Sequence, residues 1–293
     1  MENRTWFITG ISSGFGRHLT ELLLARGDRV AGTVRDRATV ADLVNDRLWL
    51  ADLDVTDLGA VRRVVDRAFE EVGPIGVVVS NAGYGLFGAG EEATDEQMLH
   101  AVATNLLGSM QVIRAALPHL RAQGGGRILQ LSSMAGQAAL PGGSMYHAGK
   151  WGIEGFVDAV AQEVAVFGIG CTLVEPGGAR TNFRYGSSKL APRIPAYDAS
   201  PSVGIRKILE AGSLQSIGDP IAMVERMIAC VDQTPAPRRL VLGSDAYATM
   251  HGQLSARLAE LETQKAIAFS TDVPDQNGKR SVEAALDAGR VSP

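Results

Sequence analysis

Tyr146 and Lys150 have side chains whose types and spacing could perform acid–base chemistry. Four residues separate them, so on a helix they lie on the same face. A phenol has a pKa near ~10 and is a weak base at neutral pH, but a neighbouring ammonium group lowers that pKa. A packed tyrosine beside a solvated lysine has the same spacing. The pair therefore indicates a general acid/base only where other polar groups converge on it.

Ser133 is the polar group that we expect to converge on this pair. It follows a predicted strand over 127–131, and Tyr146 begins a predicted helix over 145–167. Both hydroxyls can then face one site at the carboxyl edge of a parallel sheet. Ser132 is the alternative, but adjacent residues of a strand point to opposite faces.

A glycine-rich loop near the N-terminus is typical of phosphate binding. Gly10, Gly14 and Gly16 lie between a predicted strand over 5–9 and a predicted helix with Phe15 on its apolar face. Glycines let the backbone approach a pyrophosphate, and the N-terminus of the helix offers free N–H groups. The spacing G-x-x-x-G-x-G differs from the G-x-G-x-x-G fingerprint. A glycine-rich turn needed only for packing remains the alternative.

Short apolar runs alternate with helical patterns along most of the chain. Strands are predicted over 5–9, 29–34, 48–53, 75–80, 127–131, 171–174 and 240–242, and the longer helices over 57–72, 94–123, 145–167 and 219–231. This alternation predicts an α/β fold, a Rossmann-type doubly wound parallel sheet of about seven strands, with helices on both faces of a single domain. We place this catalytic domain at residues 1–250.

Two segments fall outside the alternation. Residues 182–200 are rich in Pro, Gly and Ser and carry Phe183, Tyr185 and Tyr197. A loop this long is usually a lid or disordered, so we expect a substrate-binding lid that extends to about 215. Residues 251–293 are expected to form a helical appendage and a tail, which is polar from about 270 apart from an apolar patch at 282–286.

Composition limits the class of partner. The formal net charge is −4 and the pI is about 5.8, which argues against nucleic acid or an anionic membrane as a partner. No apolar run approaches the ~20 residues of a membrane span, and the N-terminus does not have a signal-peptide pattern. The two cysteines, Cys171 and Cys230, cannot build a disulfide framework, and no metal cluster is expected. We therefore expect a cytoplasmic protein.

Seven motifs occur in the order found in the short-chain dehydrogenase/reductase family, and the chain resembles that family over residues 4 to about 245. They are Thr9–Gly16, Asp54-Val55, Asn81-Ala82-Gly83, Asn105, Ser133, Tyr146-x-x-x-Lys150 and Pro176-Gly177-x-x-x-Thr181. The stretches TGISSGFG and PGGART are closest in style to hydroxysteroid- and retinol-dehydrogenase-like members. One departure is Gly149, where relatives commonly have serine, and glycine inside a helix costs ~1 kcal/mol relative to alanine.

The resemblance implies a role for each matching residue. Tyr146 would be the general acid/base, Ser133 would hold the substrate oxygen, and Lys150 would tune Tyr146 and bind the nicotinamide ribose. Asn105 would anchor a water of the proton relay. The cofactor-binding set would be Gly10, Ser12, Ser13, Gly14, Phe15, Gly16, Arg35, Asp54, Val55, Asn81, Ala82, Gly83, Tyr146, Lys150, Pro176, Gly177 and Thr181.

The activity implied is a nicotinamide-dependent oxidoreductase that interconverts a carbonyl and a secondary alcohol on a small molecule. A regulatory cofactor-binding protein without turnover is one alternative. An isomerase, dehydratase or epimerase on the same scaffold is another. Family members pair through helices that correspond to residues 104–122 and 146–167, which implies a homodimer or homotetramer.

The end of the second predicted strand favours NADP(H) over NAD(H). NAD sites usually place an acidic residue there, about 20 residues past the glycines, to bind the ribose hydroxyls. Here the strand ends in Val34 and Arg35 follows, and a guanidinium attracts a 2′-phosphate. Asp36 also fits the spacing, but it lies two residues beyond the strand end. We expect its carboxylate to point into solvent or to pair with Arg35 or Arg37.

Overall fold

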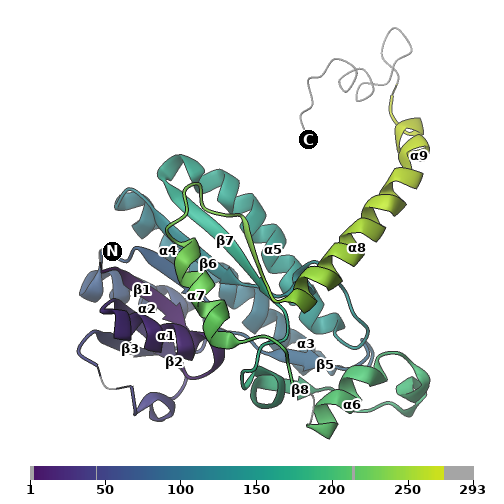
Figure 1. Ribbon diagram of the computed structural model, residues 1–293, viewed down its shortest axis with the longest axis horizontal. Helices are drawn as coiled ribbons and strands as arrows, with labels where there is room; N and C mark the ends of the chain where they lie inside the picture. The colour runs from purple at the N-terminus through teal and green to yellow at the C-terminus, as the bar shows by residue number, and fades with distance from the viewer. Residues whose placement is uncertain (1–2, 44, 213–214, 274–293) are drawn as a thin grey trace. The chain divides into compact units, whose positions relative to one another are not determined.

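A parallel sheet of seven strands runs through the computed structural model, which describes residues 3–43, 45–212 and 215–273 (Figure 1). The strand order is β3-β2-β1-β4-β6-β7-β9, so the order reverses between β1 and β4. The strands are β1 (Thr5–Thr9), β2 (Arg29–Val34), β3 (Leu48–Asp52), β4 (Val77–Ser80), β6 (Gly126–Leu131), β7 (Ile169–Pro176) and β9 (Arg239–Leu242). The predicted doubly wound Rossmann-type sheet is confirmed.

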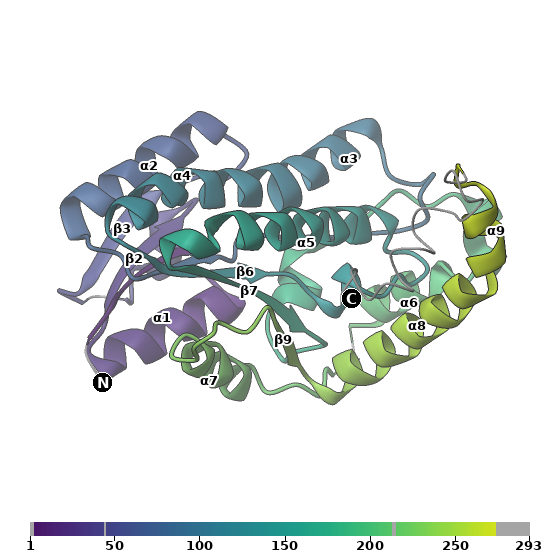
Figure 2. The same cartoon turned by 90° about the horizontal axis from the view of Figure 1, so that it is seen from above.

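Helices cover both faces of this sheet (Figure 2). Helices α1 (Gly14–Arg26) and α7 (Pro220–Cys230) lie on one face, and α2 (Leu58–Val72), α4 (Ser109–Ala122) and α5 (Ser144–Val164) on the other. Neighbouring residues of β1 show why the strands are mostly apolar: Trp6 and Ile8 belong to the core of the first face, and Phe7 to that of the second. Both faces of such a strand pack against helices, which favours apolar side chains at successive positions.

The boundaries of α2 follow from its sequence. Asp57 accepts a hydrogen bond from the backbone N–H of Ala60 at 2.8 Å and so caps the first turn. Val61, Val65 and Ala68 are fully buried against the sheet at helical spacing. Gly73 ends the helix.

The helix predicted over 94–123 is confirmed at both ends but is not uniform. It starts as α3 (Asp95–Val102), with a capping box between Thr94 and Gln97. A wider π-helical segment, Ala103–Gly108, interrupts it before α4 continues the chain. Such segments often occur at functional sites, and this one carries Asn105.

Several elements were not predicted from the sequence. β5 (Gly85–Phe87) pairs in parallel with β8 (Ser188–Leu190), and α6 (Val203–Ala211) follows. Residues 182–200 are thus not the irregular loop that we expected, because they contain this strand and a 3₁₀ turn, Pro195–Ala199. Three-residue strands carry too little periodicity to be recognised, and their pairing joins segments about a hundred residues apart.

The chain divides into two compact units, residues 1–248 and 249–293. The sheet and its flanking helices belong to the first unit. Helix α8 (Ser244–Thr263) begins at the end of the first unit and continues into the second, which also contains α9 (Lys265–Ser270). The apolar patch at 282–286 lies outside the described residues. In the described part of the chain, no helix has the length and apolar character needed to cross a membrane.

Candidate active site

The glycine-rich loop between β1 and α1 has the shape of a phosphate cradle. Gly10 and Gly14 have φ angles of +74° and +57°, a region that favours glycine. A Cβ atom at Gly16 would overlap the carbonyl oxygen of Gly10. Ser12 and Ser13 are exposed, and Ser13 makes no side-chain cap to α1. The first N–H groups of α1 are therefore left uncapped by a side chain, as an anion site at a helix N-terminus requires.

Hydrogen bonds from Asn81 hold this loop against the end of β4. Its Nδ2 donates to the carbonyl oxygens of Thr9 at 2.8 Å and Gly10 at 3.0 Å, and the backbone N–H groups of Asn81 and Ala82 both donate to Thr9 Oγ1. A Cβ at Gly10 would lie 3.2 Å from the Cα of Ala82. The side chain of Asn81 thus fixes the shape of the cradle.

Arg35 lies at the end of β2 and is exposed. It forms no hydrogen bond or ion pair with another described side chain. Of the two alternatives that we expected for Asp36, the structure agrees with exposure to solvent and not with a pair to a neighbouring arginine. Its carboxylate accepts from the backbone N–H of Ala38 at 2.9 Å and caps a short 3₁₀ helix. Arg37 pairs instead with Asp52 at 2.9 Å. The local turn therefore uses the Asp36 carboxylate and leaves the Arg35 guanidinium unbonded.

Asp54 and Val55 follow the carboxyl end of β3. The Asp54 carboxylate accepts hydrogen bonds from the backbone N–H and the hydroxyl of Thr56, and these bonds, with smaller contributions from the charges of Arg35 and His100, lower its pKa. Val55 is buried, and a Cβ at Gly108 would lie 2.7 Å from its carbonyl oxygen. The π-helical segment therefore packs directly on this turn.

Tyr146 lies in the first turn of α5, and its side chain is buried. The Ser133 hydroxyl lies close enough to lower the pKa of Tyr146. Ser133 Oγ accepts from the N–H of Ala135 at 3.2 Å and donates to the carbonyl oxygen of Pro176 at 3.5 Å. Ser132 points elsewhere and donates to Glu154, as the alternation of side chains along an extended chain predicts. The structure therefore brings Ser133, and not Ser132, to Tyr146.

Burial raises the pKa of Tyr146 to about 12, although the hydrogen bond with Ser133 opposes the rise. We had expected the Lys150 ammonium to lower this pKa. Lys150 Nζ lies 5.7 Å from the centre of the Tyr146 ring and donates to the carbonyl oxygen of Leu131 at 2.7 Å. Because removal from water outweighs the opposing effect of Ser133, Tyr146 is a neutral phenol at neutral pH.

Lys150 is itself buried, with 6% of its surface exposed. Burial lowers its pKa to about 8, and the charge of Glu154 opposes this change. At neutral pH the side chain is therefore mostly an ammonium, but a modest change in its surroundings would remove the proton.

Asn105 is held by the backbone of Tyr84. Its Oδ1 accepts from the Tyr84 N–H at 3.0 Å, and its Nδ2 donates to the Tyr84 carbonyl at 2.9 Å. A Cβ at Gly83 would lie 3.0 Å from Asn105 Oδ1, and one at Gly149 would lie 3.0 Å from the Asn105 Cβ. Glycine at 149 thus lets α5 approach the π-helical segment closely, which explains the departure from serine at this position.

The segment after β7 lies next to the glycine-rich loop. Gly177 donates to the carbonyl oxygen of Leu242 at 2.8 Å, and Gly178 donates to the carboxylate of Asp245 at 2.7 Å. The nearest atom to a Cβ at Gly14 would be the Thr181 Cβ, at 3.8 Å. The structure therefore brings the Pro176–Thr181 motif to the phosphate cradle.

The predicted lid contributes aromatic side chains unequally. Phe183 packs against Tyr146 with ring centres 5.9 Å apart, and Phe87 of β5 packs on the same ring at 5.7 Å. Tyr185 is 44% exposed, and the Tyr197 hydroxyl donates to Glu91 at 2.7 Å on the surface. Of the three aromatic residues, Phe183 is the one that packs against Tyr146, and the substrate-binding roles of Phe183, Tyr185 and Tyr197 stay predictions.

A buried ion pair anchors the segment that we predicted to be a lid. Arg206 of α6 donates to Glu92 Oε2 at 3.0 Å and to the carbonyl oxygen of Ala191 at 2.9 Å. Glu92 also accepts from the N–H groups of Ala89 and Ile194. Although burial raises the pKa of Glu92, these donors outweigh it and the net pKa is lowered. The pair ties α6 and the strand β8 region to the loop after β5.

Replacing Arg206 by methionine should loosen the lid. Removing one partner of a buried pair costs about 3 kcal/mol, so amide hydrogen exchange over residues 188–199 should accelerate by about two orders of magnitude. Arg193→Met is the matched control, because Arg193 pairs with Asp198 on the exposed surface. Equal exchange rates in the two variants would show that the buried pair does not hold the lid.

The fold and these contacts define a nucleotide-binding protein of the Rossmann class. Residues 4–190 match the family model described as short chain dehydrogenase. The oxidoreductase BOA17 of Botryotinia fuckeliana is 36% identical over 247 residues, which cover 83% of this chain and 90% of that protein. The chain belongs to the short-chain dehydrogenase/reductase family of oxidoreductases.

Solved structures agree with this family. A short-chain dehydrogenase from Streptomyces avermitilis is 35% identical, with a TM-score of 0.86, and the match covers 92% of this chain and 99% of that one. A family member from Burkholderia phymatum in complex with NAD is 19% identical, with a TM-score of 0.75, covering 87% and 95% of the two chains. The second likeness is one of fold alone.

Sequence reasoning missed several groups around the site. Phe87 and the Glu92–Arg206 pair come from segments with no recognisable pattern. Glu154, Glu175 and Arg239 were also missed, although two signals were present: Glu154 follows Lys150 by four residues, and Glu175 is a charged residue inside an apolar strand. A charge in a strand buried on both faces is rare unless it is paired.

Proposed function

We propose that the protein is an NADP(H)-dependent oxidoreductase that interconverts a carbonyl and a secondary alcohol of a small molecule. The observation that carries this proposal is the buried Tyr146 hydroxyl, which lies close enough to Ser133 for that hydroxyl to lower its pKa, and which is one helical turn from Lys150. A buried phenol of this kind is suited to exchange a proton with a substrate oxygen. It lies at the carboxyl edge of the sheet, where ligands of doubly wound folds bind.

The residues present fit a dinucleotide cofactor. Gly10, Gly14 and Gly16 leave a cradle that a Cβ would fill, and Thr181 adjoins it. The pyrophosphate would be held by Gly10, Ser12, Ser13, Gly14, Phe15 and Gly16, and the adenine by Asp54 and Val55. The nicotinamide ribose region would be held by Asn81, Ala82, Gly83, Tyr146 and Lys150. The nicotinamide itself would be held by Pro176, Gly177 and Thr181. When bound, nicotinamide would supply or accept a hydride.

The unbonded guanidinium of Arg35 supports NADP(H) over NAD(H). A 2′-phosphate can accept two hydrogen bonds from one guanidinium, whereas the carboxylate of Asp36 is already used by a backbone N–H. The NAD bound to the Burkholderia phymatum protein does not decide this question, because that likeness concerns the fold alone.

The chain's own residues suggest how a carbonyl would be reduced. Ser133 would donate a hydrogen bond to the substrate oxygen and hold it beside Tyr146. Tyr146, kept protonated by burial, would give its proton to that oxygen as negative charge develops there. Lys150 would stabilise the resulting phenolate, and Asn105 would hold a water through which the proton is replaced. Phe87 and Phe183 would exclude other water from the ring of Tyr146.

Two other functions remain as alternatives: a regulatory cofactor-binding protein without turnover, and an isomerase, dehydratase or epimerase. Cofactor absorbance followed during incubation with ketones, steroids, retinoids and polyketide-like carbonyls separates the three. An oxidoreductase consumes one cofactor for each product formed. A regulatory protein binds the cofactor but consumes none, and an isomerase forms product without net cofactor change.

Three finer points belong to the same proposal. The substrate would be of the kind used by hydroxysteroid- or retinol-dehydrogenase-like members, the protein would act in the cytoplasm, and it would form a homodimer or homotetramer. Helices α4 and α5 would make the contacts between subunits, as the family resemblance implies.

A further inference from the structure

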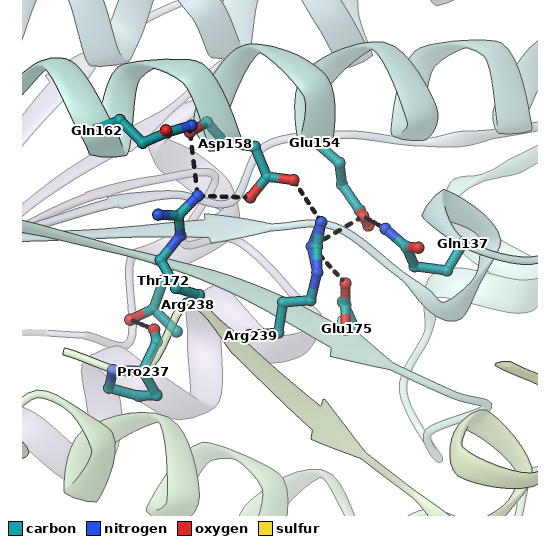
Figure 3. Close-up of polar contacts among 9 residues, drawn as sticks. All are labelled: Gln137, Glu154, Asp158, Gln162, Thr172, Glu175, Pro237, Arg238 and Arg239. Carbon is teal, nitrogen blue, oxygen red and sulfur yellow. Dashed lines mark hydrogen bonds and ion pairs between the residues drawn. The ribbon is translucent and has the colours of Figure 1, made fainter. Parts of the chain in front are cut away.

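A cluster of acidic and basic side chains lies between α5 and the strands β7 and β9 (Figure 3). Glu154 and Asp158 come from α5, Glu175 from β7 and Arg239 from β9. Arg239 Nη1 lies 3.4 Å from Glu154 Oε2 and 3.2 Å from Glu175 Oε1, and Nη2 pairs with Asp158. Arg238 Nη2 lies 3.2 Å from Asp158 Oδ1.

The two glutamates of this cluster have different surroundings. Glu154 is 2% exposed and accepts hydrogen bonds from the Ser132 hydroxyl and the Gln137 amide as well as from Arg239. Glu175 is fully buried, and its Oε2 has no hydrogen-bond partner among the described residues. Three donors stabilise an ionised carboxylate, whereas a buried oxygen without a donor disfavours one. The geometry therefore assigns the ionised form to Glu154 and the protonated form to Glu175.

The charges agree with this assignment. Burial raises the pKa of Glu175 to about 8, and the charge of Glu154 raises it further against the effect of Arg239. With Glu175 neutral, the two carboxylates Glu154 and Asp158 face the two guanidiniums of Arg238 and Arg239. Ionisation of Glu175 would add a further negative charge beside Glu154, at a fully buried position where an ionised carboxylate is disfavoured.

Glu154 lies one helical turn from Lys150, on the same face of α5. Lys150 is buried and has lost its hydration, and its described hydrogen bond goes to the neutral carbonyl of Leu131. Ser132 connects the two sites, since it adjoins Ser133 in the chain and donates to Glu154. Glu154 therefore supplies a negative charge beside a lysine whose ammonium form burial disfavours.

We propose that Glu154 is a positioning residue for the active site: its buried carboxylate stays ionised because Glu175 holds the single proton of the cluster, and this charge keeps Lys150 in the ammonium form. Only the effect of this charge on catalysis rests on the proposed function. An ammonium at position 150 is what would stabilise a Tyr146 phenolate, so the cluster would set the upper pH limit of activity.

The test is the titration of Lys150 by NMR, on the complete protein without cofactor or substrate. The chain has five lysines, so selective labelling at the lysine side chain gives few signals, and the Lys150→Arg variant assigns the one of interest. In Glu154→Gln the pKa of Lys150 should fall by about one unit or more, as expected for loss of an adjacent opposite charge. Glu175→Gln, the matched control, should shift it by less than half as much, because a glutamine imitates the protonated acid.

A charge-retaining variant is the second control for this titration. Glu154→Asp retains the charge and should keep the Lys150 pKa close to that of the wild type. An unchanged Lys150 pKa in Glu154→Gln, or a larger shift in Glu175→Gln, would overturn the proposal. In an active enzyme, the fall of kcat with rising pH should move to lower pH in Glu154→Gln, because Lys150 would lose its proton earlier.

If Glu154→Gln does not fold, infrared spectroscopy tests which form of the Glu175 carboxyl group is present. The wild type at pH 7 should show the C=O band of a protonated carboxylic acid, and Glu175→Gln should lack it. Absence of this band in the wild type would refute the assignment of the proton. A protein that titrates as described but consumes no cofactor would refute the proposed function and leave the proton assignment standing.

Discussion

The Tyr146→Phe variant should lose about 10²–10⁴-fold in kcat for carbonyl reduction, the contribution that a positioned general acid usually makes. Phenylalanine keeps the ring that packs between Phe87 and Phe183, so the fold and the shape of the site should be retained. The substitution removes only the proton donor and the hydrogen bond with Ser133. Steady-state kinetics on a substrate found in the carbonyl screen measure the loss, and cofactor titration should give a Kd close to that of the wild type.

Tyr84→Phe is the matched control for this experiment. The Tyr84 hydroxyl bonds with His100 of α3 at 2.9 Å and has no part in the proposed proton transfer. Its loss should change kcat by no more than a few fold. A Tyr146→Phe variant that kept most of the wild-type kcat would show that another group moves the proton.

Arg35→Ala should lower kcat/KM for NADP(H) by about 10- to 100-fold and leave kcat/KM for NAD(H) almost unchanged. A hydrogen bond to a charged group contributes about 1.5–3 kcal/mol, and only the 2′-phosphate of NADP(H) would lose it. The measurement compares both cofactors in the wild type and in the variant, at one salt concentration because exposed charge interactions are screened by salt.

Arg37→Ala provides the control for a general loss of positive charge. Arg37 is two residues away and is also exposed, but it is paired with Asp52, so its removal should change the cofactor ratio little. A wild type that prefers NAD(H), or an unchanged ratio in Arg35→Ala, would contradict the preference for NADP(H).

The sequence by itself determined the sheet and the edge at which the site lies. The seven strands of the main sheet fall where apolar runs predicted them, because a strand covered on both faces favours apolar side chains at successive positions. The spacing of Tyr146 and Lys150 places both on one helix face, and the spacing of Ser133 brings it to them, because parallel strands and their following helices meet at one edge. These relations depend on residues near one another in the chain.

Only the tertiary structure decided which distant groups meet. Glu92 and Arg206 are 114 residues apart, and Glu175 and Arg239 are 64 apart, yet each pair forms inside the protein. Local periodicity reports that a face is buried, but not what covers it. The same packing removes Tyr146 and Lys150 from water, and this burial, which no spacing reveals, raises the pKa of one and lowers that of the other.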